Sequence, residues 1–157
     1  MAAAPFAAEL DTLASTRRHV LDVLAPLTLA QVNRIPEGFN NNLVWNAAHC
    51  FVTQVLLTEG LSGLPVDDLP ANFLATYRKG GRPTRDVDAE ELAFVRRCLA
   101  EGPERLRGVL AAADRSAFRP YATSYGVELT RLGEAVRFNN VHEAMHYGVM
   151  LAQRRLV

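Results

Sequence analysis

Apolar residues recur at helical spacing in four separate stretches of the sequence, and no long alternating pattern typical of a strand competes with them. Such stretches bury one face each, so they must pack on one another. They predict an all-α fold, a four-helix bundle within a single domain spanning residues 1–157. The predicted helices run from about Phe6 to Ala25, from the Asn40-Asn41-Asn42 run to about Leu61, from about Val87 to Ala113, and from about Leu132 to Leu156.

Local residues set expectations for the ends and faces of these helices. In the first helix, leucine and valine form the buried stripe, and Arg17 and Arg18 are expected to point towards water. An asparagine of the 40–42 run is expected to cap the second helix, and Thr130 the fourth. In the third, Pro103 either bends one helix or divides it into two, and the sequence leaves both alternatives open.

Two connections are too irregular to be helices. Residues 64–86 contain three prolines and two glycines, which predicts a long crossover between the second and third helices. Within it, residues 79–82 are interpreted as a basic turn. Residues 118–128 alternate weakly in the manner of a strand, but the segment is expected to be too short to build a sheet.

Composition excludes several classes of function. Acidic and basic residues number 17 each, which argues against an electrostatic nucleic-acid binder. No stretch approaches the roughly 18 apolar residues of a membrane span, and the first residues lack a signal-peptide pattern. We therefore expect a cytoplasmic protein in which Cys50 and Cys98 are buried free thiols.

The histidines carry the strongest chemical signal. His142 and His146 are four residues apart in the last helix, so their imidazoles lie one turn apart on the same side. His49 lies on an apolar face of the second helix, where a structural role in the core is the alternative. Together the three predict a three-nitrogen site for one divalent metal ion, with open coordination positions. His19 is expected at the surface.

The segment from His142 to His146 also matches the HExxH pattern of zinc peptidases, in which the glutamate is the general base. No residue able to act as a third ligand follows His146, so a peptidase is disfavoured. Glu143 lies about 100° around the helix from His142. We therefore favour a role for Glu143 as hydrogen-bond partner of a ligand histidine, or a structural role, over a role as catalytic base. A surface ion pair is a further alternative.

Four segments in this order resemble the DinB-like superfamily of helical-bundle metalloproteins. The segment from Phe39 to His49 is similar to the second helix of that family, which opens with an asparagine and places a tryptophan four residues before a ligand histidine. Residues 61–65 and 77–83 resemble its long crossover. The segment from Val141 to Gly148 resembles its C-terminal ligand motif.

The resemblance implies a zinc- or nickel-like ion on His49, His142 and His146, and often a homodimer. It implies no single activity, since relatives include transferases and isomerases that use a low-molecular-weight thiol, and many other members are assigned as hydrolases without characterisation. Two hypotheses follow: a metal-dependent enzyme acting on a small molecule, or a non-catalytic metal- or ligand-binding bundle. Residues that could line the pocket are Asn42, Asn46, Asn139 and Tyr147.

Overall fold

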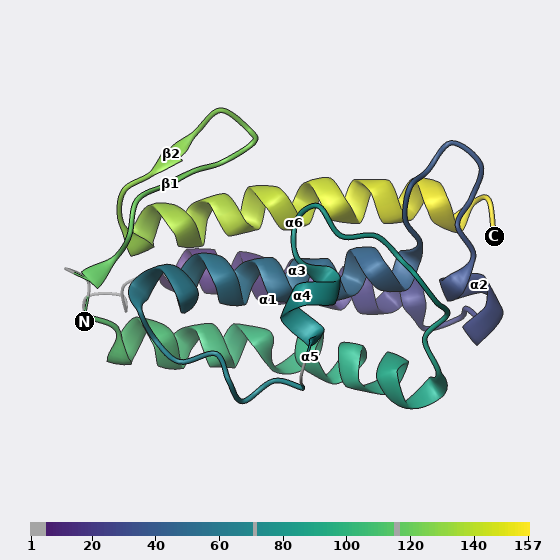
Figure 1. The fold of residues 1–157 in the computed structure, drawn as a ribbon, viewed down its shortest axis with the longest axis horizontal. Coiled ribbons are helices and arrows are strands. Elements are labelled where there is room, and N and C mark those ends of the chain that lie inside the picture. Colours follow the sequence, from purple (N-terminus) through teal and green to yellow (C-terminus); the bar gives the residue numbers. More distant parts are fainter. Residues whose placement is uncertain (1–5, 71, 115–116) are drawn as a thin grey trace.

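Four long helices lie along the long axis of the molecule in the computed structural model, which describes residues 6–70, 72–114 and 117–157 (Figure 1). Two of them, α3 and α1, each pack against both α5 and α6. The predicted all-α four-helix bundle is confirmed, and the helices differ from their predicted ranges only at the ends. Their bounds are α1 Ala7–Leu24, α3 Leu43–Thr58, α5 Ala89–Ala112 and α6 Leu132–Arg154.

Short elements fill the connections. The short helix α2 (Leu29–Asn33) is an addition to the predicted helices, and it begins with a capping box formed by Thr28 and Gln31. The crossover between α3 and α5 contains η1 (Gly60–Ser62) and α4 (Phe73–Tyr77), joined by irregular chain as expected.

The alternating segment does form a strand pair, contrary to the prediction. Strand β1 (Tyr121–Ala122) pairs antiparallel with β2 (Glu128–Leu129) in a hairpin beside the first half of α6 (Figure 1). The turn depends on Gly126, whose φ of 84° suits glycine. The expectation failed because the strands are only two residues each and need no larger sheet.

The helix α3 is enclosed on nearly all sides. Its residues are almost all buried, because α5, α6 and α4 pack around it. Asn42 caps its start by accepting a hydrogen bond from the backbone N–H of Trp45 at 2.9 Å. This burial places the polar side chains of α3, except that of Thr53, inside the protein, where each needs a partner.

The helix α5 continues through Pro103 as one helix, which decides between the two alternatives. The preceding Gly102 lies against side chains of α1 and α3. Its carbonyl accepts a hydrogen bond from Gln54 Nε2 at 2.9 Å, and a Cβ at this position would lie 2.7 Å from Arg17 Nη1. A glycine is therefore required by packing.

Two local expectations are wrong. Arg17 points into the bundle and is 1% exposed, because its charge is matched there by Glu143. Thr130 is not the N-cap of α6: Arg131 holds that position without a side-chain cap, and the Thr130 N–H donates to Glu134 instead. Cys50 and Cys98 are buried free thiols, as expected. No helix in the described ranges is long and apolar enough to cross a bilayer.

Candidate metal centre

The three histidines identified from the sequence meet between α3 and α6. One ring nitrogen from each of His49, His142 and His146 lies within 4.8 Å of the others. The Nε2 atoms of His49 and His142 are 3.2 Å apart. That distance suits either a hydrogen bond from one Nε2–H to the other nitrogen or two nitrogens that bind the same ion. The cluster could therefore hold a metal ion.

Two interactions orient His49. Its Nδ1 lies 2.6 Å from the carbonyl oxygen of Tyr77, so Nδ1–H donates there and Nε2 keeps its lone pair for the cluster. Its ring also stacks on Trp45, with centroids 4.7 Å apart and planes 14° from parallel. Both contacts fix the ring plane.

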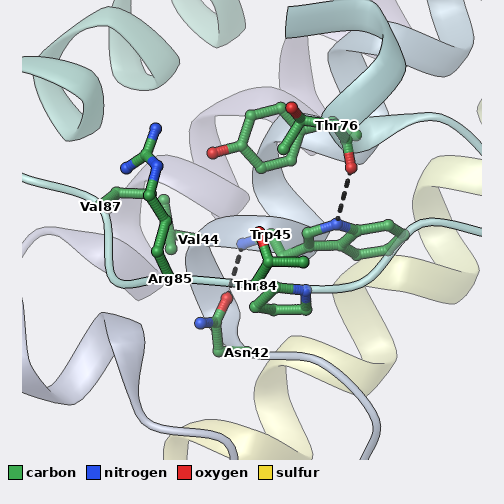
Figure 2. Close-up of a pocket in the computed structure, with 9 residues that line it drawn as sticks. Asn42, Val44, Trp45, Thr76, Thr84, Arg85 and Val87 are labelled. Atoms are coloured by element: carbon green, nitrogen blue, oxygen red, sulfur yellow. Dashed lines mark hydrogen bonds between the residues drawn. The ribbon is translucent and has the colours of Figure 1, made fainter. Parts of the chain in front are cut away.

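The crossover holds Trp45 in turn. Figure 2 shows its indole N–H directed at the carbonyl of Thr76, at 3.2 Å, while its backbone N–H is bonded to Asn42. A cavity of about 60 Å³ lies beside these residues, which is too small for an ordinary ligand. The helix α4 of the crossover therefore positions His49: Tyr77 binds its ring directly, and Thr76 holds Trp45, on which the ring stacks.

Asn46 on α3 orients His146 on α6. Its Nδ1 lies 2.8 Å from Asn46 Oδ1, which leaves Nε2 as the free nitrogen. The amide of Asn46 is itself fixed, since its Nδ2 lies 3.0 Å from Gln153 Oε1. Asn46 is thus the acceptor that sets the tautomer of His146.

His142 differs from the other two. Its Nδ1 is buried and has no hydrogen-bond partner among the described residues. A buried polar atom without a partner is unusual in native proteins and often marks a site where water or a ligand binds. His142 is thus the least firmly oriented of the three rings.

The environment keeps all three histidines neutral near pH 7. Burial lowers the pKa of His142 to about 2, helped by His146 and His49. Burial, with His49, lowers the pKa of His146 to about 4. Burial also lowers the pKa of His49, against the opposing effect of its bond to Tyr77. Neutral imidazole is the form that binds a metal.

Glu143 lies away from the cluster. It is fully buried, which excludes the surface ion pair, and its carboxylate accepts hydrogen bonds from the Arg17 guanidinium and from Asn139 Nδ2. Burial opposes the charge on Arg17, but Glu143 outweighs burial and raises the pKa of Arg17. No bond joins Glu143 to a histidine among the described residues.

None of the four residues suggested as pocket lining belongs to the described lining of the cavity that adjoins the histidines. Asn46 contacts the cluster, whereas Asn42 caps α3 and Asn139 bonds to Glu143. Tyr147 packs against the core and stacks on His19, which is exposed as expected, with centroids 5.8 Å apart.

A cavity of about 300 Å³ adjoins the three histidines. The sequence did not reveal most of its walls, because they come from the hairpin, from the basic turn, and from residues of α3 and α6 that lie one or two turns from the histidines. The alternation of residues 121–125 was the one signal that could have pointed to the hairpin. Besides the histidines, the described lining comprises Thr53, Leu57, Lys79, Tyr121, Thr123, Ser124, Tyr125, Phe138 and Met145.

The fold and the histidine cluster together define a helical-bundle protein with a site that could hold a metal ion. A family model described as the DinB superfamily matches residues 12–150, and the chain belongs to this superfamily. The resemblance found in the sequence is thereby confirmed. A comparison with curated proteins finds no match to the chain.

Proposed function

We propose that the chain is a metal-dependent enzyme that acts on a small molecule. One observation carries the proposal: three neutral histidines converge beside a cavity large enough for a ligand. A structural zinc site normally has four protein ligands. Within the described ranges the cluster has three, and Cys50 is not a member. A position facing the cavity is then left for an exchangeable ligand.

The expected metal is one zinc or nickel ion per chain, held by His49, His142 and His146. Imidazole suits both metals. When bound, such an ion supplies Lewis acidity and lowers the pKa of a water or thiol ligand. The protein contributes orientation: Tyr77 fixes His49, and Asn46 fixes His146.

Two reaction classes fit this arrangement, hydrolysis and transfer of a low-molecular-weight thiol cosubstrate. A zinc peptidase fits less well, because Glu143 is paired with Arg17 inside the bundle and is fully buried. A carboxylate held there has no access to the cavity. We expect no peptidase activity, and no activity that depends on Glu143 as a base.

The alternative is a non-catalytic, metal- or ligand-binding dimeric bundle. Its support is an exposed apolar strip on α6, formed by Val141, Met145 and Val149, which are 37–45% exposed. In either case we propose a homodimer that uses this strip, a cytoplasmic location and no nucleic-acid partner. Sedimentation of the parent and of Val149→Glu would test the dimer.

Metal analysis tests the centre itself. Purified protein should contain up to one zinc or nickel ion per chain, and His142→Ala with His146→Ala should remove it. Full retention of the metal in that folded double variant would disprove the assignment.

Thermal unfolding with a small thiol or hydroxamate then separates the enzyme from the non-catalytic module. An open site predicts stabilisation of about 2.7 kcal/mol at 100 times the dissociation constant, and none in the metal-free protein. Metal content is measured afterwards, because a chelator could strip the ion. A metal that stays bound while no thiol or hydroxamate shifts the melting temperature would favour the non-catalytic module.

A further inference from the structure

The cavity beside the histidine cluster has one fully charged wall residue among the described residues that line it, Lys79. Lys79 is exposed, and none of the ion pairs between described residues includes it. No aspartate or glutamate belongs to the described lining. Lys79 therefore gives this wall a positive charge.

The backbone ties Lys79 to the cluster. Two residues earlier, the carbonyl of Tyr77 accepts the hydrogen bond from His49. The turn that follows is tight: the Gly81 N–H donates to the Arg78 carbonyl at 3.0 Å, and a Cβ on Gly81 would lie 2.6 Å from the carbonyl oxygen of Thr76. Lys79 is therefore held at the cavity by the same stretch of chain that orients a predicted ligand.

Another part of the cavity wall is apolar or aromatic. Leu57 and Phe138 supply apolar surface from α3 and α6, and Met145 extends it. The hairpin adds Tyr125, whose ring centroid lies 6.1 Å from that of Phe138 although the side chain is 59% exposed. Aromatic and thioether side chains around an open volume favour a flat, apolar ligand body.

We propose that this cavity binds a small molecule with an apolar, ring-sized body and one anionic group, with the anion facing Lys79 and the reacting group facing the three histidines. The inference rests on the proposed function, because the reacting group is taken to meet a metal there. A volume of about 300 Å³ lies at the small end of ligand sites and suits a ligand of this size.

Two matched probes test the inference in zinc-loaded protein: 4-(mercaptomethyl)benzoate, and 4-methylbenzyl mercaptan, which has a similar shape without the charge. Both carry a thiol for the metal, so they differ mainly in the group offered to Lys79. Dissociation constants are measured by calorimetry. The benzoate should bind more tightly, by about threefold to tenfold, as expected for a partly exposed charge pair.

Variants assign that preference to its source. Lys79→Met should abolish the preference for the benzoate and leave the affinity of the neutral thiol unchanged. Lys79→Arg should retain the preference. The control is Arg82→Met, which removes a like charge from the same exposed turn but from a residue outside the cavity lining, and should change neither affinity. Tyr125→Ala should weaken both thiols, by about twofold to tenfold.

The outcomes separate the two proposals. If both thiols bind equally, or if Lys79→Met leaves the preference intact, the anionic substrate class is wrong while the open metal site stands. If Tyr125→Ala changes neither affinity, the hairpin is not a wall for the ligand body and that part of the inference is overturned. If neither thiol binds protein that holds zinc, the proposed open site fails, and the inference fails with it.

Discussion

Asn46 on α3 and His146 on α6 are joined through Oδ1 and Nδ1, 2.8 Å apart. This bond selects the tautomer in which Nε2 faces the cluster. Loss of such a partner typically weakens metal binding by about 10–100-fold. We therefore expect Asn46→Ala to lower zinc affinity by that factor, measured by competition with a chromogenic chelator.

Asn140→Ala is the control for that variant. It removes an amide of the same kind from α6, one that bonds to the backbone of Glu9 at 2.9 Å and does not touch the histidines. Its zinc affinity should equal that of the parent. Equal affinities for all three proteins would show that His146 needs no help from Asn46.

The pair of Arg17 and Glu143 predicts a stability effect without a metal effect. Glu143→Gln leaves the buried guanidinium without its counter-charge, which should cost about 3–5 kcal/mol in the free energy of unfolding. Urea unfolding measures this loss, while metal content of the folded variant should stay unchanged. A stable variant that loses its metal would instead place Glu143 in the centre.

A double variant tests the same pair from the other side. Arg17→Met combined with Glu143→Leu replaces both charges by apolar groups, and such replacements of buried pairs are often neutral or stabilising. We expect the double variant to recover most of the loss. The free energy of unfolding is also measured for Arg17→Met and Glu143→Leu alone. If the loss in the double variant equals the sum of these two losses, the pair does not act as a unit.

Two glycines of α5 form a natural comparison. Gly102→Ala would place a Cβ 2.7 Å from Arg17 Nη1, a group that Glu143 prevents from moving aside, so we expect destabilisation of about 1–3 kcal/mol. Gly108 has no atom within 4 Å of a Cβ, so Gly108→Ala should stabilise the helix by up to about 1 kcal/mol. Thermal or urea unfolding of both variants checks the opposite signs.

Acidity should destabilise the metal-free protein. The pKa of His142 is lowered to about 2 and that of His146 to about 4, whereas both are about 6.5 in the unfolded chain. Below pH ~6.5 the unfolded chain therefore binds more protons, and the free energy of unfolding decreases as the pH falls towards about 4. Each histidine contributes at most about 1.4 kcal/mol per pH unit.

Urea unfolding at several pH values across that window measures the effect. The variant with His142→Ala and His146→Ala lacks both groups, so its stability should depend less steeply on pH. Parallel profiles for parent and variant would mean that the two histidines titrate normally in the folded protein.

The sequence predicted the bundle because apolar periodicity reports directly which helix faces are buried. It placed His142 and His146 on one side of α6 because i and i+4 spacing fixes that relation without any tertiary information. It failed for Arg17, since a charged residue gives no local sign that a counter-charge 126 positions later will bury it. The same limit hid Lys79, whose role depends on where a crossover returns to the bundle.

Trp45 is the single tryptophan of the chain, and it stacks face to face on His49. Its fluorescence therefore reports on one predicted ligand without any label. A change in the charge or coordination of His49 should alter the emission, and a paramagnetic ion such as Cu²⁺ should quench it strongly. Titration with metal would then follow filling of the site optically, and His49→Ala, which removes both the stacked ring and a predicted ligand, should weaken this response.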